Sequence, residues 1–176
     1  MEVVTDRDGL VYTMRRNLIE PTVFVISVDK DGRPNGMAAG WNMKCSYDPP
    51  TLAVAILKTN NTCRLIKESK EFVIAVPTPE LRKDLEYFGN VHGFDVDKFK
   101  ETGIKTLPGT AGRTPLLADA RINFECKLHS SAQPADHVIF FGTIQAAHYD
   151  KSKDQLFYKG RNNAGERVFD AMPDTQ

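Results

Sequence analysis

The first half of the chain alternates short apolar runs with clusters of turn-forming residues. The run TVFVISV (residues 22–28) is rich in β-branched residues and predicts a strand. After the turn cluster DKDGRPN, a second strand is expected to begin near Gly36 and continue through MAAGWNM, which predicts a hairpin. The run TLAVAIL (51–57) is apolar on both faces, as in a buried strand. Before it, Asp48-Pro49-Pro50 is expected to stop any ladder, because proline has no N–H to donate.

The second half contains three further strand patterns and a shorter one. FVIAV (72–76) is an apolar strand, and HVIFFGTIQAAHY (137–149) is a long strand with Gly142 as an expected bend or bulge. LFYKG, from Leu156, is the last short strand. RINFECKLH alternates as a half-exposed antiparallel strand does. Its alternation predicts Ile122, Phe124, Cys126 and Leu128 facing inward, with Arg121, Asn123, Glu125 and Lys127 facing outward.

Helical signals are few and short. TCRLIKES (62–69) predicts a helix capped by Thr or Asn. Thr78-Pro79-Glu80 is a helix start, after which Leu81, Leu85 and Phe88 share one face until Gly89 ends the run. A small helix is expected over 96–101, and 104–117 has the composition of a loop.

These elements favour one fold class. About seven strands follow one another at hairpin spacing, with two or three short helices inserted, and no βαβ alternation is present. The pattern predicts a mostly β protein, an antiparallel Greek-key barrel. A length of 176 residues favours a single domain over 1–176.

Composition narrows the function classes. Lys plus Arg and Asp plus Glu number 23 each, so the formal net charge is zero, which argues against nucleic-acid and anionic-membrane partners. The three cysteines lack zinc spacing, so no metal is expected. The N-terminus has no signal-peptide pattern, and no stretch is long enough to span a bilayer. A reduced cytoplasmic protein is therefore expected.

The second predicted strand has almost no side chains over part of its length. Gly36, Ala38, Ala39 and Gly40 leave the backbone bare, as happens where a ligand approaches closely. A flat ring system laid there would accept hydrogen bonds from main-chain N–H groups. The alternative is a strand packed tightly against a helix or a subunit, and the residues alone leave both open.

The start of the helix in KTNNTCRLIK lacks the usual acidic residue. Helix N-termini carry free N–H groups and a positive dipole end, so they suit phosphate. Here Lys58 precedes the helix, Arg64 and Lys67 lie within it, and Thr59, Asn60 and Thr62 add side-chain donors. An external anion explains this composition; an ordinary capped helix with a solvated basic face explains it as well.

Two further segments are not specific by themselves. The loop GNVHG (89–93) follows a predicted helix, and Asp136-His137 begins a predicted strand. A third, Gly109-x-x-Gly112, suggests a nucleotide-binding loop, but no strand precedes it and no clear helix follows. That interpretation is discarded.

Taken in order, six motifs resemble the flavin reductase-like family, the FMN-binding split barrels that include flavoredoxins. They are DGRPNGMAAGW, SYDPP, AILKTNNTCRLI, FGNVHGFDVDKF, PLLADA and DHVIFFGTI. The resemblance covers about 21–160 and leaves an extension at each terminus.

The resemblance implies a homodimer with FMN in a groove near the subunit interface. It implies ring contacts from Met37, Ala38, Ala39, Gly40, Trp41 and Asn42, with Cys45 and Ser46 nearby. It implies phosphate contacts from Lys58, Thr59, Asn60 and Thr62. Phe88 and Gly89 are expected to close over the flavin, and His137 to lie near a nicotinamide.

The function expected from this resemblance is an NAD(P)H:flavin oxidoreductase, in which NAD(P)H gives hydride to the flavin N5. Without a dinucleotide-binding fingerprint, the nucleotide would have to fold into the flavin groove itself. Reduced FMN would then leave as free flavin or pass electrons to an acceptor protein. One alternative is a flavoredoxin-type carrier that keeps its FMN; another is a flavin-free barrel that acts as an interaction module.

Overall fold

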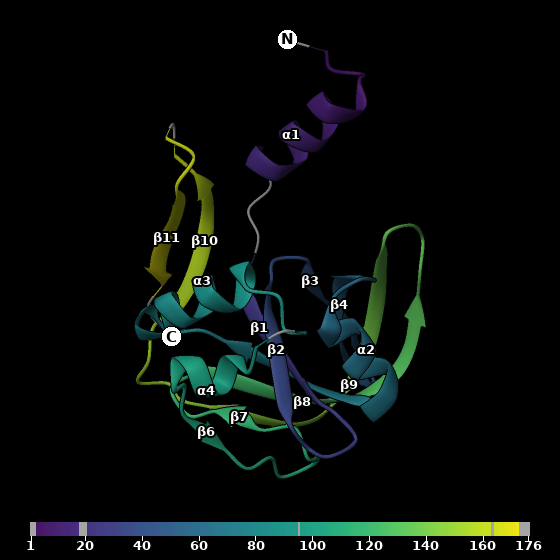
Figure 1. Ribbon diagram of the computed structural model, residues 1–176, viewed down its shortest axis with the longest axis vertical. Helices are drawn as coiled ribbons and strands as arrows, with labels where there is room; N and C mark the ends of the chain where they lie inside the picture. Colours follow the sequence, from purple (N-terminus) through teal and green to yellow (C-terminus); the bar gives the residue numbers. More distant parts are fainter. Residues whose placement is uncertain (1–2, 18–20, 95, 163, 173–176) are drawn as a thin grey trace.

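The structure, a computed structural model, describes residues 3–17, 21–94, 96–162 and 164–172. Its main feature is a seven-stranded sheet in the order β2-β1-β5-β8-β9-β4-β3 (Figure 1). Every strand pair in it is antiparallel. The strands are β1 (Val23–Val28), β2 (Pro34–Ala39), β3 (Asn42–Tyr47), β4 (Pro50–Leu57), β5 (Glu71–Val76), β8 (Ile122–Ala132) and β9 (His137–Tyr149).

The predicted hairpin is present as β1 and β2, but the second strand is shorter than expected. β2 ends at Ala39, and β3 begins at Asn42 on the opposite edge of the sheet. The prediction that the prolines stop all pairing was wrong by one position, because Pro50 opens β4 opposite Tyr47. A proline is tolerated as the first residue of a strand, where its missing N–H costs least.

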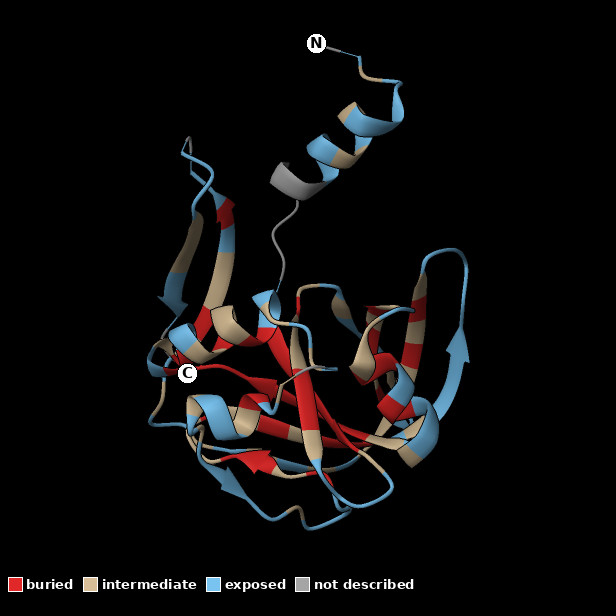
Figure 2. Ribbon diagram, viewed as in Figure 1, coloured by how far each residue is buried: buried red, intermediate tan, exposed pale blue. Residues whose placement is uncertain are grey.

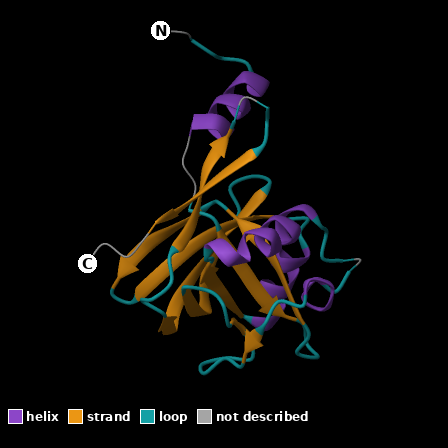
Figure 3. Cartoon of the chain, turned by 90° about the vertical axis from the view of Figure 1, so that its left-hand side faces the viewer, coloured by secondary structure: helices purple, strands orange, loops and turns teal. Residues whose placement is uncertain are grey.

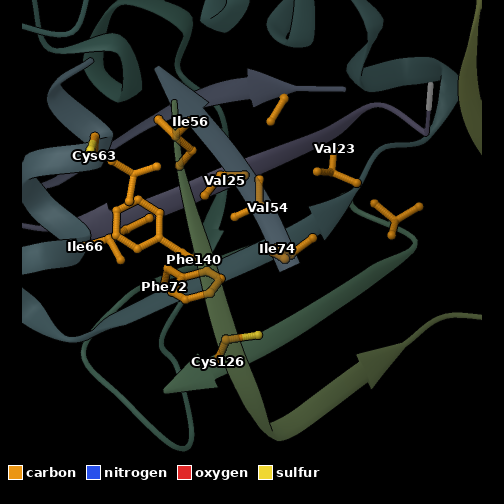
Figure 4. Close-up of a cluster of buried hydrophobic side chains, with 13 residues drawn as sticks. Val23, Val25, Val54, Ile56, Cys63, Ile66, Phe72, Ile74, Cys126 and Phe140 are labelled. Atoms are coloured by element: carbon orange, nitrogen blue, oxygen red, sulfur yellow. The ribbon is translucent and has the colours of Figure 1, made fainter. Parts of the chain in front are cut away.

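One face of the curved sheet encloses the main core. Val25 of β1, Ile74 of β5 and Phe140 of β9 point into it from strands far apart in the sequence (Figure 4). Helix α2 (Asn61–Ser69) closes this core with Cys63 and Ile66. Antiparallel strands that enclose a core in this way give the mostly β class that the sequence predicted.

A second layer covers the outer face of β1 and β5. It comprises the 3-10 turn η1 (Pro79–Leu81), α3 (Arg82–Asn90) and α4 (Lys98–Thr102). The predicted apolar face is its contact surface, since Leu85 and Phe88 of α3 pack with Phe24 of β1. Together with α2, these helices gather on one side of the strands (Figure 3).

The outward residues predicted for β8 are a correction. Arg121, Asn123 and Glu125 are buried, and only Lys127 is exposed. Burial in the sheet as a whole is shown in Figure 2. The segment 104–117, which forms β6 (Thr106–Leu107) and β7 (Leu116–Leu117), folds back over this face. Alternation along a strand identifies its two faces but not what covers the second one.

Gly142 lies opposite an irregularity in the β8–β9 pairing, but the extra residue is His129 of β8 and not Gly142 itself. The register shifts between Leu128 and Ser130, directly opposite Gly142. A Cβ on Gly142 would stand 2.4 Å from the Phe72 ring, so the close packing of that ring requires glycine. Glycine at position 142 therefore allows the close packing of the core.

The predicted strand LFYKG is present in β10 (Gln155–Arg161), whereas α1 (Arg7–Asn17) and β11 (Arg167–Met172) were not predicted. α1 projects beyond the sheet, and β10 pairs with β11 in a hairpin that stands beside α3 (Figure 1). None of the described helices is both long enough and apolar enough to cross a membrane.

Candidate functional site

Strand β2 is an edge strand, so half of its backbone groups face away from β1. Two hollows lie along it. The first, here called the small cavity, has a volume of about 80 Å³ and lies between β2, the start of α2 and the end of α3. The second, called the large cleft, has a volume of about 700 Å³ and lies between the end of β2, α3, α1 and the β10–β11 hairpin. Ala38 and Gly89 line both.

The start of α2 forms one wall of the small cavity. Asn60 precedes the helix in extended conformation, and its side chain does not cap the helix; its Nδ2 instead lies 3.4 Å from the sulfur of Met37. No acidic residue occupies the first turn. Thr62 is buried at this wall. Free N–H groups at a helix start, with no acid beside them, favour an anion.

The loop after α3 covers the small cavity from the other side. The carbonyl of Gly93 accepts hydrogen bonds from Asn35 of β2 and Asn61 of α2, both at 2.7 Å. A Cβ at Gly93 would stand 2.3 Å from the Asn35 side chain, so only glycine allows this approach. The loop thereby fastens β2 to α2 across the cavity.

A buried lysine forms the floor of the small cavity. Lys98 of α4 is only 2% exposed, and its Nζ donates to the carbonyls of Gly36 at 3.0 Å and Phe88 at 2.9 Å. Within the described residues it has no carboxylate partner. Burial lowers its pKa to about 8, because an ammonium loses hydration inside the protein. The cavity thus contains a positive charge that no carboxylate of the described residues pairs with.

The glycines at the groove separate two explanations of the bare strand. A Cβ at Gly36 would stand 2.9 Å from the Val25 carbonyl oxygen, so tight packing within the protein explains this glycine. A Cβ at Gly89 would stand 3.3 Å from that of Ala38, which keeps α3 close to β2 where the hollows meet. Beyond that junction, Ala39, Gly40 and Trp41 line the large cleft.

His137 lies close to the bare strand, at the start of β9. Its ring is stacked at a tilt on Trp41, with centroids 4.5 Å apart. Its Nδ1 lies 2.8 Å from a carboxylate oxygen of Asp136, and this hydrogen bond lowers the Asp136 pKa. The carboxylate orients the imidazole, and Nε2 makes no hydrogen bond to the described residues.

Comparison with known proteins decides the family. Residues 14–166 match the model of the flavin reductase like domain. The chain belongs to the flavin reductase-like family. An uncharacterised protein of the archaeon Pyrococcus abyssi is 34% identical over 154 residues, which cover 88% of this chain and 83% of that protein. An Acinetobacter baylyi protein named FMN reductase (NADH) RutF is 27% identical over 80% of this chain and 72% of its own length.

A solved member supports the fold. The flavoredoxin of Desulfovibrio vulgaris (Miyazaki F) is 25% identical and superposes with a TM-score of 0.80, covering 100% of this chain and 95% of that one. The predicted split-barrel class is therefore confirmed.

The groove fits the parts of a flavin nucleotide that the family binds. A cavity of about 80 Å³ has room for roughly two or three waters, so it suits a phosphate group and excludes a ring system. The large cleft is within the roughly 300–1,000 Å³ range of ligand pockets. Lys98 and the start of α2 would hold the phosphate, and the backbone of 38–41 would hold the ring.

The family resemblance predicted fourteen cofactor contacts, and the structure brings nine of them to the two hollows. These are Met37, Ala38, Ala39, Gly40, Trp41, Asn60, Thr62, Phe88 and Gly89, and the Phe88 carbonyl also accepts a hydrogen bond from Lys98. The Phe88 ring itself packs in the core between Phe24 and Phe99.

The other predicted contacts lie outside both hollows. The Asn42 amide donates to the carbonyls of Ala39 and Gly40 and so holds the turn that ends β2. Cys45 and Ser46 are on β3, where the Ser46 hydroxyl accepts from the Asp48 N–H. Lys58 and Thr59 are exposed. In this structure of one chain, these five residues are not brought to the groove.

Sequence reasoning missed three groups that line the groove. Asn35 and Asn61 hold the loop at Gly93, Lys98 forms the floor, and Arg161 and Arg167 line the large cleft. The motif FGNVHGFDVDKF contains Lys98. However, a lysine in a short amphipathic helix is usually solvated, so only tertiary structure identifies it as buried.

Proposed function

We propose that this protein binds FMN along β2 and accepts reducing equivalents from NAD(P)H. The single observation that carries the proposal is the junction at Ala38 and Gly89, where a phosphate-sized cavity meets a bare strand facing a large cleft. Bound FMN supplies the hydride-accepting chemistry. The chain supplies the anion site, a ring surface without side chains, and an imidazole at His137 that is oriented by Asp136.

Flavin binding is tested by titrating the purified protein with FMN and following flavin absorption and fluorescence. Thr62→Glu places a carboxylate at the start of α2, where it would repel phosphate and occupy the helix N-terminus. We expect the Kd for FMN to rise at least about a hundredfold. Thr62→Val keeps the shape of threonine and adds no charge, so we expect it to change the Kd for FMN by only a fewfold.

The matched control is Lys67→Glu, which changes charge on the same helix but outside the small cavity. Circular dichroism confirms that each variant is folded. If Thr62→Glu binds FMN as tightly as Lys67→Glu, the phosphate assignment is wrong, even with the fold correct. A wild-type protein that takes up no FMN at all would support the flavin-free interaction module instead.

The reductase step is tested separately by stopped-flow mixing of the FMN-loaded protein with NADH or NADPH. Bleaching of the flavin band within seconds is expected. A flavin that stays oxidised with both nucleotides, yet is reduced by dithionite, would favour the second candidate, a flavoredoxin-type carrier. The likeness to the Desulfovibrio flavoredoxin over the whole chain is the observation that keeps this candidate.

We further propose a homodimer that uses β3, the second edge strand of the sheet. Met43 is 61% exposed and Tyr47 is 88% exposed on this strand, and Trp41 precedes it at 40%. An exposed apolar edge of this kind favours pairing with another chain. Light scattering after size exclusion should give twice the chain mass, and the double variant Met43→Lys/Tyr47→Lys should give the monomer. A monomeric wild type would contradict this.

A further inference from the structure

The large cleft carries an excess of positive charge. Four charged side chains line it: Asp8, Glu86, Arg161 and Arg167. Both acids are already paired, Asp8 with Arg7 at 3.0 Å and Glu86 with Arg82 at 3.6 Å. Neither Arg161 nor Arg167 makes an ion pair within the described part of the chain, and Arg161 donates only to the Gly165 carbonyl.

The two arginines lie next to each other on the β10–β11 hairpin. They face each other across the β10–β11 pair. Arg167 Nη1 lies 3.7 Å from where a Cβ on Gly89 would stand, so its guanidinium is next to the junction at Ala38. Arg161 is the direct partner of Arg167 on β10, at the same level of the hairpin, and donates to the Gly165 carbonyl.

Aromatic rings complete the same wall. Tyr158 and Phe169 of the hairpin both line the cleft, with ring centroids 5.6 Å apart. The Arg82 guanidinium carbon lies 5.1 Å from the Phe169 centroid, although its charge is already paired with Glu86. Flat rings and fork-shaped cations together suit a ligand with both an aromatic group and phosphates.

The anion that this wall suits is different from the flavin phosphate. The small cavity, with Lys98 and the start of α2, lies on the far side of the Ala38–Gly89 junction. A flavin with its phosphate there would extend its ring toward the cleft and leave the arginines unoccupied. Because the flavin phosphate would have its own site, the arginines suit the anion of a second molecule that approaches the ring from the hairpin side.

We propose that Arg161 and Arg167 bind the phosphates of the nicotinamide nucleotide that reduces the flavin. This inference rests on the proposed function. The sequence contains no dinucleotide-binding fingerprint, so we expect residues of this domain to contact the phosphates of the nucleotide. Arginine provides them as bidentate hydrogen bonds. The pyrophosphate is common to NADH and NADPH, whereas the ribose phosphate belongs to NADPH alone, so the experiment distinguishes the two sources.

The test compares Arg167→Gln, Arg161→Gln and the double variant with Lys159→Gln. Lys159 lies on the same hairpin and pairs with Asp170 at 3.1 Å, but it does not line the cleft. Three quantities are measured on each FMN-loaded protein: the Kd for FMN, the KM for NADH and NADPH in flavin reduction, and the Kd for NAD⁺ and NADP⁺ by calorimetry. We expect each arginine variant to raise the nucleotide KM and Kd about tenfold. The Kd for FMN should stay unchanged.

Equal losses for both nucleotides would assign the arginines to the pyrophosphate, and a loss for NADPH and NADP⁺ alone would assign them to the ribose phosphate. Either result supports the proposal. Unchanged nucleotide binding overturns it, and so does weakened FMN binding, because the arginines would then hold the flavin. If the wild type reacts with neither reductant, the proposed reductase function fails. NADP⁺ binding that is lost in the variants would still support the site, and no NADP⁺ binding by the wild type would overturn it.

Discussion

The two hollows along β2 share a wall at Ala38 and Gly89 but are built in opposite ways. The small cavity, about 80 Å³, is lined by backbone groups, by amides that hold its covering loop, and by the buried Lys98. The large cleft, about 700 Å³, takes its charge from long arginine side chains on a hairpin that stands beside the body (Figure 1). One end of the groove is preorganised, and the other is open.

This difference predicts how long each ligand stays. Charges in a desolvated cavity interact strongly, because the local dielectric is low, and are little affected by salt. Exposed guanidinium groups interact more weakly and are screened by ions. A phosphate in the small cavity should therefore be retained while an anion in the cleft comes and goes. This is the behaviour expected if the small cavity holds a cofactor that is retained and the large cleft binds a reductant that exchanges.

The largest expected effect comes from closing the junction itself. Gly89→Leu places a branched side chain against Ala38, where even a Cβ would have only 3.3 Å. Because both hollows lose their shared wall, we expect FMN binding to weaken more than about a hundredfold, equivalent to about 3 kcal/mol. Fluorescence titration with FMN measures it.

Lys83→Leu, at an exposed position of the same helix, is the control for that variant. It should bind FMN as the wild type does. Tight binding by a folded Gly89→Leu protein would mean that the flavin does not cross this junction, and the comparison of the two hollows would lose its basis.

The second largest effect is on stability, at a site away from the groove. Glu125 of β8 accepts hydrogen bonds from Ala111, Thr110 and His148, at 2.7–3.1 Å. Burial alone would raise its pKa, but these hydrogen bonds outweigh burial and lower the pKa to about 2. Glu125→Gln should therefore reduce the free energy of unfolding by about 2 kcal/mol at pH 7. Urea unfolding measures it.

The sign of the pH dependence follows from the lowered pKa. The contribution of Glu125 is fully present above the ordinary pKa of a glutamate, 4.5, and is lost as the pH falls toward about 2. The stability difference between the two proteins should thus shrink from pH 5 to pH 2. Glu166→Gln, an exposed carboxylate, should cost little. An FMN affinity reduced by Glu125→Gln would show that this loop and the groove are coupled.

The same loop shows what the sequence could not reveal. The strand patterns were readable because inward positions repeat every second residue and must be apolar. Glu125 and Asn123 followed the outward pattern correctly, yet they are buried, because the segment 104–117 returns over them. Gly109 and Gly112 are explained by this return: Cβ atoms there would stand 2.9 Å from Glu125 Oε2 and 2.6 Å from Glu71 Oε2. The periodicity of one strand does not predict which distant segment will cover it.

The groove was predictable where chemistry is local and not where it comes from distant elements. The bare strand at Ala38 and the acid-free helix start at Thr62 each leave a signal in a few consecutive residues, and the structure brings both to the groove. Lys98 and Arg167 are ordinary charged residues in sequence. Their positions depend on how α4 and the β10–β11 hairpin pack, so no spacing rule could select them.

A third, smaller effect tests the charge in the small cavity. Lys98→Met removes an ammonium whose burial is costly but whose two hydrogen bonds to Gly36 and Phe88 offset that cost, so the net change in stability should be small. The FMN phosphate, in contrast, loses its attraction to the ammonium and gains nothing in its place, so the Kd for FMN should rise about tenfold. Lys100→Met, exposed on the same helix, is the matched control.

The pKa of Lys98, lowered from 10.5 to about 8, gives two opposite pH trends. The unfolded chain keeps its proton up to about 10.5, so the stability of the wild type relative to Lys98→Met should rise between pH 8 and 10.5. FMN affinity should fall over the same range, as the cavity loses its charge. His92 also lines this cavity, so His92→Gln is measured in parallel. An FMN affinity equally flat in wild type and Lys98→Met would remove Lys98 from the phosphate site.

The smallest effect is expected at His137, which touches the open end of the groove through Trp41 and not the closed one. His137→Gln keeps a hydrogen-bonding side chain but loses the stacked imidazole. Because the ring surface rests on backbone, the Kd for FMN should stay within about twofold. Because the nicotinamide would approach from this side, the rate at which NAD(P)H reduces the flavin should fall by about three- to tenfold. Asp136→Asn, which keeps the imidazole but removes the carboxylate that orients it, should give an intermediate rate. The reverse result is a raised Kd for FMN with an unchanged rate of flavin reduction. It would mean that His137 contacts the flavin and that the open end is part of the cofactor site.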